Sequence, residues 1–573
     1  RATGNFTDLS GTVASISTVG GAGGGNITIR HGGQGVPPFI VGDPSTNGTL
    51  SAITSGNFTI APTQSFPFNF TEGNVQLIGT PPSRFSFPGG DDSSSEDDPH
   101  ILIPIPKDSA KSSDLPIAES IEPYVTKPYK SRLVGIESKP IKTLDEVKAE
   151  LFEIEEATGV KPAIIYALFL PTPVKALSES GGSAQASKQL ELVLVTSKGL
   201  PVRHQIGVSS ETVTEMIKQF RGEIEKISPK EVYLKTAKQL YQWLVTPLHE
   251  ILKAQEITNL VFVMDKGLRS LPIAALHDGK EFLVQQYSVG LMPSLSLTDT
   301  RYVDVKDLNV LGMGAQKFSD PIHNPLPGVV SELDVITSQL WPGSKKLLDR
   351  DFTENNLRDE RKNRPAGILH FATHADFQPG EPNKSYIQLW GDEKVTLNRL
   401  RDLKLYDPPV ELMTLSACKT ALGDEDAELG FAGLAAQAGV KSALGSLWNV
   451  SDEGTVGLMT TFYGKLKESD IKIKAEALRQ TQLDMLRGRI RIGEGRLITA
   501  YSSILLPGVI LAGGADSPLP QKAFDDRGIT VIKTNPKEGE GDPSLLQENI
   551  ENGGGNFNHP FYWSGFTMVG SPW

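Results

Sequence analysis

The chain has 573 residues, of which 38% are hydrophobic and 22% are charged, and its formal net charge is -12. This length exceeds that of one ordinary hydrophobic core, so we expect two or three domains. The acidic balance, together with the lack of a Lys/Arg stripe interleaved with aromatic residues, argues against nucleic acid as a ligand.

The only cysteine is Cys418, which excludes an intrachain disulfide. No set of Cys and His residues has the spacing of a zinc site, so we expect neither a metal nor a cofactor. The longest apolar stretch, Ile498 to Ala515, is interrupted by polar residues and by Pro507, so we predict no membrane span. The chain starts at Arg1 without an apolar signal segment, which predicts a fragment or a processed product whose true N-terminus, and any export signal, are missing.

Residues 1–80 are rich in Gly, Ser, Thr and Asn and poor in charge. Four Gly-Asn pairs, each followed by alternating apolar and polar residues, recur at uneven spacing: Gly4-Asn5, Gly25-Asn26, Gly56-Asn57 and Gly73-Asn74. Short period-2 strands between such turns favour coils of a parallel β-helix, and a flexible Gly/Ser-rich tail is the alternative. The segment resembles the terminal coils of filamentous-haemagglutinin-type adhesins. That resemblance implies a bacterial protein at the cell surface or outside the cell; a cytoplasmic location is the alternative.

Two segments have no apolar periodicity and are predicted to be disordered linkers. Residues 81–129 are rich in Pro, Ser and acids, most clearly in the run Asp91 to Asp98. Residues 516–558 combine charged residues with a Gly553-Gly554-Gly555 triplet and are interpreted as an insertion loop before a final strand.

Between the linkers, strand and helix patterns alternate, which indicates a mostly parallel α/β sheet covered by helices on both faces. In chain order we predict a helix over 143–158, a strand over 190–197, helices over 210–227 and 230–254, and strands over 260–264 and 308–312. The alternation continues to Ser446.

Two later strands end in reactive side chains. The apolar run 367–373 leads into His374, and the run 411–415 leads through Ser416 and Ala417 into Cys418. Ligands and catalytic groups collect at the carboxyl edge of parallel strands. If the two strands are neighbours, the imidazole and the thiol therefore face one crevice. The alternative is that both residues are inert packing.

A Cys/His pair at such an edge suits nucleophilic catalysis. A free thiol with a pKa near 8.5 is only slightly ionised at neutral pH, and a neighbouring imidazole raises the thiolate fraction and supplies a proton to the leaving amine. The backbone N–H groups of Cys418 and Ala375 are the predicted donors to a tetrahedral oxyanion.

Several sequence blocks, in order, resemble the CHAT family of caspase-like peptidases, which are relatives of separase. The blocks are 268–276, 292–294, 368–375 (ILHFATHA), 415–423 (LSACKTALG), 442–452 (SALGSLWNVSD) and 559–563. The resemblance implies a caspase-like sandwich with a Cys418/His374 dyad. His370, four residues before His374, lies deeper within the strand and is interpreted as a structural residue. The resemblance divides residues 130–573 into an N-terminal part (130–305), a core (306–515), the insertion loop (516–558) and a closing strand (559–573).

Substrate recognition is predicted at three polar residues. Separase-like enzymes place an acid shortly after a Trp to receive a basic P1 residue, whereas here Trp448 is followed by Asn449, with Asp452 three positions later. This departure puts a strict Arg or Lys preference in doubt. Asp424, in an acidic stretch after Cys418, is a further candidate, although a solvated acidic loop is the alternative.

The sequence thus predicts a cysteine endopeptidase whose partner is a polypeptide substrate, with an activating or inhibitory protein as a further partner. One alternative is a surface-displayed adhesin or scaffold whose caspase-like domain is silent or serves protein interaction. A latent peptidase, released by a partner or by cleavage in a linker, is the intermediate possibility.

Overall fold

The computed structural model describes most of the second half of the chain and parts of the first. The described residues are short segments within 6–80, and residues 117–130, 140–171, 188–320, 323–376, 384–416, 439–449, 451–493, 495–505 and 554–573. Cys418 and Asp424, and most of the two predicted linkers, lie outside them. Residues 1–109 and 110–573 form two compact units.

The first unit is a set of short strands around a small apolar core. β5 (Ile27–Gly32) pairs in parallel with β12 (Val75–Thr80), whereas β8 (Ala52–Ser55) pairs antiparallel with β9 (Phe58–Ile60). Buried side chains at the centre of this unit are Ile27, Val41, Ile53, Ile60, Val75 and Leu77. Coils of a β-helix stack in parallel, so the mixture of pairings does not confirm the predicted β-helix. The surface or extracellular location that rested on it stays a prediction.

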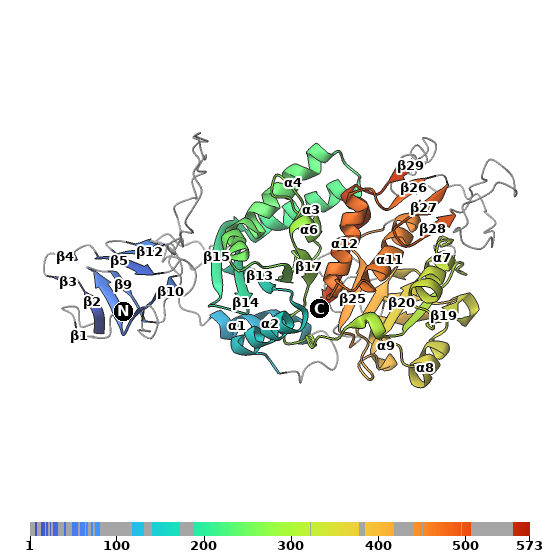
Figure 1. Ribbon diagram of the computed structural model, residues 1–573, viewed down its shortest axis with the longest axis horizontal. Helices are drawn as coiled ribbons and strands as arrows, with labels where there is room; N and C mark the ends of the chain where they lie inside the picture. The colour runs from blue at the N-terminus through green and yellow to red at the C-terminus, as the bar shows by residue number, and fades with distance from the viewer. Residues whose placement is uncertain are drawn as a thin grey trace, which may run out of the picture. The chain divides into compact units, whose positions relative to one another are not determined.

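The second unit is built on one large mixed sheet (Figure 1). Among the described residues the sheet has eleven strands in the order β15-β14-β13-β16-β17-β30-β25-β24-β20-β18-β19. Their bounds are β13 (Pro162–Pro171), β14 (Lys188–Thr196), β15 (Val202–Ser209), β16 (Asn259–Met264), β17 (Ser288–Leu291), β18 (Val310–Gly314), β19 (Lys345–Leu348), β20 (Ile368–Ala372), β24 (Leu412–Leu415), β25 (Ser442–Ser446) and β30 (Phe566–Gly570). The predicted α/β fold with a mostly parallel sheet is confirmed.

The direction of the strands reverses across the sheet. β19, β18, β20, β24 and β25 run parallel to one another, and we call them the C-terminal half. β13, β16 and β17 also run parallel to one another and, with β14 and β15, form the N-terminal half. β30 joins the halves: it is antiparallel to β25 and parallel to β17. The carboxyl ends of the parallel strands in the two halves therefore lie at opposite edges.

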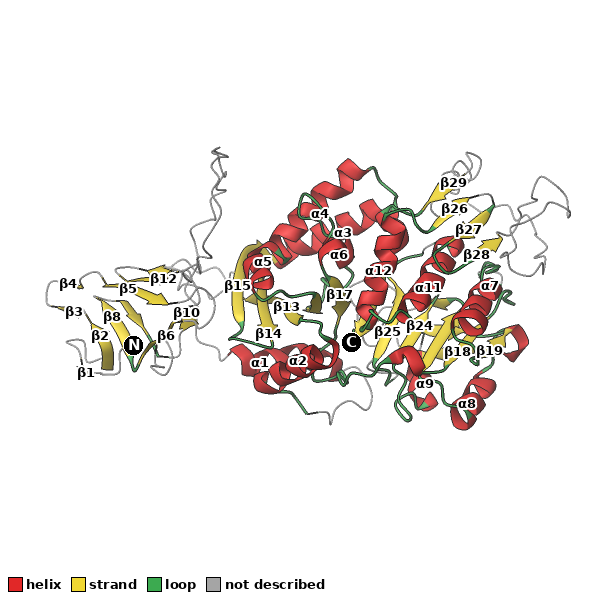
Figure 2. Ribbon diagram, viewed as in Figure 1, coloured by secondary structure: helices red, strands yellow, loops and turns green. Residues whose placement is uncertain are grey.

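Helices cover both faces of the sheet (Figure 2). Their bounds are α1 (Ile117–Lys130), α2 (Leu144–Thr158), α3 (Ser210–Glu225), α4 (Lys230–Leu244), α5 (His249–Ala254), α6 (Leu283–Gln286), α7 (Val329–Asp334), α8 (Glu354–Asn363), α9 (Leu397–Leu400), α11 (Asp452–Leu466), α12 (Lys474–Leu486) and α14 (Pro560–Trp563). Alternate residues of β13 face the two layers, since Ile164 and Tyr166 pack with α1 and α2 while Ile165 packs with α3 and α4. The helix predicted over 230–254 is interrupted at Thr246–Leu248, where Pro247 ends α4.

Both predicted linkers extend too far. The insertion loop expected over 516–558 includes β29 (Gly554–Asn556), which pairs antiparallel with β26 (Arg491–Gly493). The linker expected over 81–129 includes α1, which buries Ile121 and Val125 against the second core cluster. The sequence did not predict this helix, because its apolar face is short and its sequence contains two prolines and two glutamates. Contacts with residues far along the chain stabilise it, so no local pattern could predict it.

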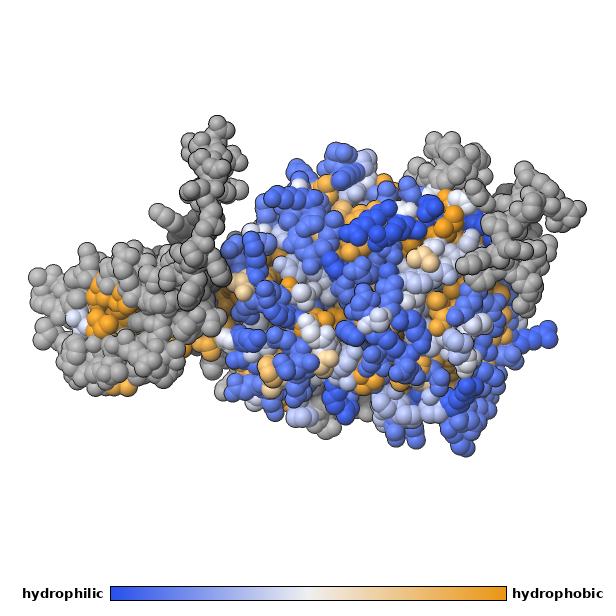
Figure 3. Space-filling view, in the orientation of Figure 1, coloured by the Kyte–Doolittle hydropathy of each residue, from blue (hydrophilic) through white to orange (hydrophobic). Residues whose placement is uncertain are grey.

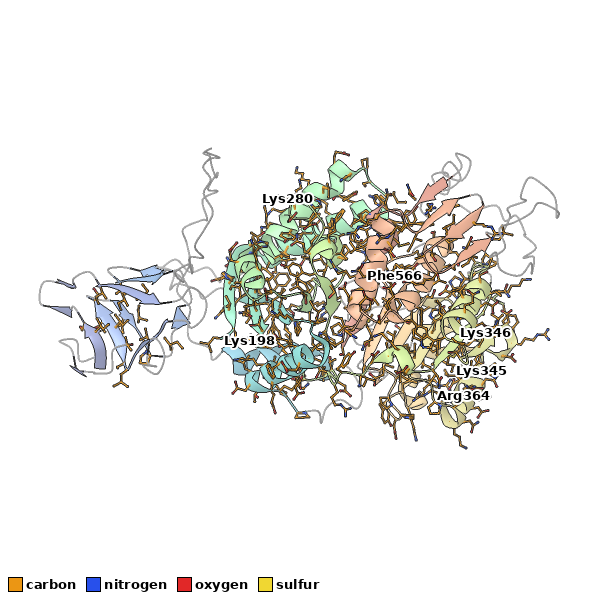
Figure 4. The ribbon with its side chains drawn as sticks, in the orientation of Figure 1. Lys198, Lys280, Lys345, Lys346, Arg364 and Phe566 are labelled. Atoms are coloured by element: carbon orange, nitrogen blue, oxygen red, sulfur yellow. The ribbon has the colours of Figure 1, made fainter. Side chains whose placement is uncertain are left out.

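The outer strand of the C-terminal half carries positive charge. Lys345 and Lys346 on β19 lie at one end of the second unit with Arg364, while Phe566 of β30 lies near the middle of the sheet (Figure 4). Lys345 pairs with Glu360 at 3.5 Å, and Lys346 pairs with Asp334. Charged lysines on an edge strand disfavour pairing with another chain. The visible face of this unit is mainly hydrophilic, with small scattered apolar patches (Figure 3).

Candidate active site

The predicted reactive residues belong to two neighbouring strands. β20 and β24 pair in parallel with Ile368 opposite Leu412 and Phe371 opposite Leu415, an offset of 44 positions (412 − 368). The pairing continues beyond the strands, since the amide of Ser416 donates to the carbonyl of Phe371 at 2.8 Å. His374 and Cys418 have the same offset (418 − 374). Cys418 itself lies outside the described residues, two positions after Ser416.

His374 follows β20 at its carboxyl edge and is half-buried. Its Nε2 lies 2.7 Å from the carbonyl oxygen of Asn324. A carbonyl oxygen only accepts hydrogen bonds, so Nε2 carries the proton and Nδ1 presents a lone pair. Burial lowers the pKa of His374, the Asn324 carbonyl opposes this shift, and His323 lowers the pKa further. The imidazole is therefore neutral at neutral pH and can accept a proton at Nδ1.

The loop after β18 supplies two rings that contact His374 and that the sequence analysis missed. The His323 ring stacks on the His374 ring, with centroids 4.8 Å apart and planes inclined by 14°. Phe318 meets the His374 ring edge to face at 4.7 Å. β18 pairs with β20 in parallel, so its end lies at the same edge as His374. The strand-end rule applied to β20 and β24 could have found this loop if it had also been applied to the strand over 308–312.

Ala375, a predicted oxyanion donor, is buried in β21 (Ala375–Asp376). β21 pairs with β22 (Tyr386–Gln388) antiparallel, with Ala375 opposite Ile387. β22 in turn pairs with β23 (Lys394–Thr396). The amide of Gln388 donates to the carbonyl of His374 at 2.9 Å, so this small sheet holds the backbone of His374 and of the residues after it. The oxyanion role of Ala375 stays a prediction.

Two of the predicted substrate-binding residues follow β25. Asn449 is exposed. The Trp448 before it is buried, and its indole N–H donates to the carbonyl of Phe561 at 2.9 Å. Asn449 thus extends from a fixed point at the same edge as His374, because β25 is parallel to β24.

Asp452 is the first residue of α11 and has a defined structural contact. Its Oδ2 accepts a hydrogen bond from the amide of Gly328 at 2.9 Å, at the end of the loop that carries His323. Burial is the main cause that raises the pKa of Asp452 to about 7, and Glu453 and Glu332 raise it further while the Gly328 amide lowers it. Because Oδ2 of Asp452 accepts the Gly328 amide, one of its two carboxylate oxygens already has a hydrogen-bond partner. The third predicted residue, Asp424, lies outside the described residues.

His370 lies deeper in the sheet than His374. It is fully buried, its Nε2 is 2.9 Å from Oε1 of the buried Glu332, and its ring meets Tyr463 edge to face at 5.3 Å. The His370–Glu332 contact has ion-pair distance without hydrogen-bond geometry. These surroundings place His370 inside the core and not at the edge.

Two further properties bear on what this edge could bind. Among the residues that the structure describes, no group of three or more His, Cys, Asp or Glu side chains could hold a metal ion. None of the described helices has the length and apolarity needed to cross a membrane.

Comparison with known proteins gives a family and several structural matches. The CHAT domain family matches residues 234–571, which is more than half of the chain. No curated protein matches. The separase of Saccharomyces cerevisiae, in two structures of the separase–securin complex, matches with TM-scores of 0.35 and 0.36 and identities of 11% and 10%. These matches cover 59% and 63% of this chain, and the chain spans only 30% and 32% of those separase chains.

A complex of the pro- and mature domains of Porphyromonas gingivalis RgpB also matches. Its TM-score is 0.29 and its identity is 12%, over 48% of this chain and 71% of that one.

Proposed function

This chain belongs to the CHAT domain family, and from this premise we propose that it is a caspase-type cysteine endopeptidase with Cys418 as nucleophile and His374 as base. The observation that carries the proposal is the state of His374: its Nε2 proton is held by the Asn324 carbonyl, and Nδ1 is left as an acceptor. His374 follows the strand that pairs with β24, and β24 leads to Cys418 in the sequence.

The proposed reaction uses the side chains of Cys418 and His374. Nδ1 of His374 accepts the thiol proton of Cys418, and the thiolate sulfur forms a bond to the carbonyl carbon of the scissile peptide. The resulting oxyanion receives hydrogen bonds from the backbone N–H groups of Cys418 and Ala375. The imidazolium then protonates the leaving amine, which breaks the peptide C–N bond and leaves a thioester. A water molecule, deprotonated by His374, hydrolyses the thioester and restores the thiol.

A short chain length separates the described edge from the nucleophile. Two residues of chain span at most about 7 Å, so Cys418 stays within a short reach of Ser416. The amide of Ser416 donates a hydrogen bond to the carbonyl of Phe371, three residues before His374. The proposal therefore requires only a local conformation that brings the Cys418 thiol to Nδ1 of His374.

Substrate binding is proposed at the loop after β25 and at the acidic stretch after Cys418. Asn449 is exposed at the edge and would contact the P1 side chain, with Asp452 and Asp424 as the acids that could favour a basic residue there. Because Asp452 already accepts the Gly328 amide, a basic P1 residue would have to share that carboxylate. A polypeptide is the substrate, and a second protein that activates or inhibits the enzyme is a further proposed partner.

The test is covalent labelling of the 573-residue chain with peptidyl acyloxymethyl ketones that carry Arg, Lys, Leu, Met or Asp at P1. Mass spectrometry should locate the label on Cys418, and His374→Ala should abolish labelling while His204→Ala, on the distant β15, should not. Peptide hydrolysis should be lost in Cys418→Ala. Hydrolysis that survives in Cys418→Ala would overturn the proposal. A folded, labelled but non-hydrolysing protein would favour a latent peptidase or a scaffold role.

A further inference from the structure

We propose that His323 is a positioning residue for His374: its ring holds the His374 imidazole by stacking, and its positive charge, once it is protonated, opposes protonation of His374. This inference rests on the proposed function, because it assigns His323 a role in the reaction that His374 would perform. The geometry that supports it is the parallel stack, with ring centroids 4.8 Å apart and an inclination of 14°.

His374 is held from three directions. Asn324 accepts the Nε2 proton at 2.7 Å, His323 covers one face of the ring, and Phe318 meets the ring at 4.7 Å. Phe318 also packs edge to face against His323 at 5.7 Å. The three contacts come from the single loop between β18 and α7, so this loop determines how the imidazole is oriented.

The loop that carries His323 is fastened at both ends. At its start, the amide and the side-chain Nε2 of Gln316 donate to the carboxylate of Asp349 at 2.8 and 3.0 Å. The amide of Leu326 then closes the loop by donating to the carbonyl of Gln316 at 3.0 Å. At its end, the amide of Gly328 donates to Asp452 at 2.9 Å. A loop that is fixed at both ends can keep the rings of His323 and Phe318 in contact with the His374 ring.

The charges around the stack favour His323 as the first site of protonation. Within the described part of the chain, the titratable groups facing His323 are Asp320 of its own loop, Asp376 of β21, Tyr386 of β22, Lys394 of β23 and His374. Two of them are carboxylates that favour a charged imidazole, and one is a lysine that disfavours it. His374 is more deeply buried, and among the residues that the structure describes no carboxylate raises its pKa.

Burial lowers the pKa of both histidines below the usual value, so both are neutral at neutral pH. When the pH falls, a proton on His323 places a positive charge one stacking distance from His374 and lowers the pKa of His374. His374 thereby stays neutral, and able to accept the thiol proton, at a lower pH than it would without His323.

The test compares His323→Phe, which keeps a stacking ring without a charge, with His323→Asn, which removes the ring and the charge. His204→Phe is the matched control. The pKa of His374 should be read in the full chain by NMR of ¹³C-labelled histidine, with His374→Ala for assignment. Both variants should raise this pKa by about one unit, and the control should not. The acid limb of kcat/KM should move to higher pH by the same amount, about a tenfold loss on that limb.

The two variants separate positioning from charge. At alkaline pH, where both histidines are neutral, His323→Asn should lower kcat with little change in KM, while His323→Phe should retain kcat. An unchanged pKa of His374 in both variants would overturn the inference, even if the protein cleaves peptides. A raised pKa without any peptidase activity would keep the His323–His374 coupling and refute the proposed function instead.

Discussion

The two halves of the large sheet place polar side chains at the carboxyl ends of their parallel strands, yet the two edges are organised differently. In the N-terminal half, helix α1 covers the edge after β16 and β17 and supplies partners to it. Glu122 of α1 accepts hydrogen bonds from the Tyr166 hydroxyl, from the amides of Leu295 and Ser296, and from the Ser296 hydroxyl, at 2.5 to 3.2 Å. Tyr124 of the same helix donates to Asp265 at 2.9 Å.

In the C-terminal half, the corresponding edge keeps an acceptor nitrogen on His374 and an exposed amide on Asn449. This difference shows that polar residues at a strand end do not by themselves form a catalytic or binding site. A covering helix turns one edge into a buried, internally bonded cluster, whereas the other edge is bordered by loops that orient its side chains. Four substitutions test this contrast, in order of decreasing effect.

The largest effect is expected at the C-terminal edge. His374→Ala should lower kcat for peptide hydrolysis at least about 1,000-fold, because the thiol of Cys418 loses its base. Stability should change little, since His374 is half-buried and contributes one hydrogen bond. Steady-state kinetics and urea unfolding of the same preparations measure both. A large loss of stability with modest loss of kcat would show that this edge is structural, like its counterpart.

At the N-terminal edge the reverse is expected. Glu122→Ala should lower the free energy of unfolding by about 3–5 kcal/mol, because buried donors on Tyr166, Leu295 and Ser296 lose their acceptor. Urea unfolding measures the change, and Glu153→Ala on the exposed side of α2 is the control. Labelling of Cys418 in the fraction that remains folded should persist. A Glu122→Ala protein of unchanged stability would remove the basis for the comparison.

The sequence predicted the C-terminal edge better than its counterpart. The strands that lead to His374 and Cys418 were predicted, because each is a short apolar run that stops at a polar residue. The His323–His374 stack was missed, because it depends on β18 lying beside β20, and strand order is a tertiary property. Helix α1 was missed because Pro123 and Pro128 suggested a linker, and only its contacts with distant residues stabilise it.

An intermediate effect is expected at Asp452, which connects α11 to the His323 loop. The pKa of Asp452 in the folded protein is about 7, above the usual 3.8, so folding disfavours the ionised form. Its contribution to stability is therefore full below about pH 4 and is lost as the pH rises through about 7. Asp452→Asn keeps an acceptor for the Gly328 amide and does not titrate. Relative to the wild type, it should gain stability between pH 4 and pH 8, with an upper bound on the order of 4 kcal/mol.

Thermal unfolding at several pH values measures this gain, and Asp359→Asn, at an exposed position of α8, should show none. If Asp452→Asn and the wild type show the same dependence of Tm on pH, then folding does not raise the pKa of Asp452, and its carboxylate is exposed to solvent. The residue would then be available to a basic substrate side chain, as its predicted role in P1 binding requires.

The smallest effect concerns a hydrogen bond by which helix α3 of the N-terminal half holds the backbone before Trp448. Nη2 of Arg221 donates to the carbonyl of Leu447 at 3.0 Å, and Nε of Arg221 donates to the carboxylate of Glu225. Arg221→Lys removes the planar donor set that makes both contacts, a loss of about 1 kcal/mol. Because Leu447 precedes Trp448 and Asn449, the proposed P1 contact, KM should rise about three- to tenfold with kcat nearly unchanged.

Arg203→Lys, which weakens a pair with Glu191 on the outer strands, is the control. Equal KM values in both variants would mean that the two halves act independently, and a loss confined to kcat would mean that α3 positions the reacting groups and not the substrate.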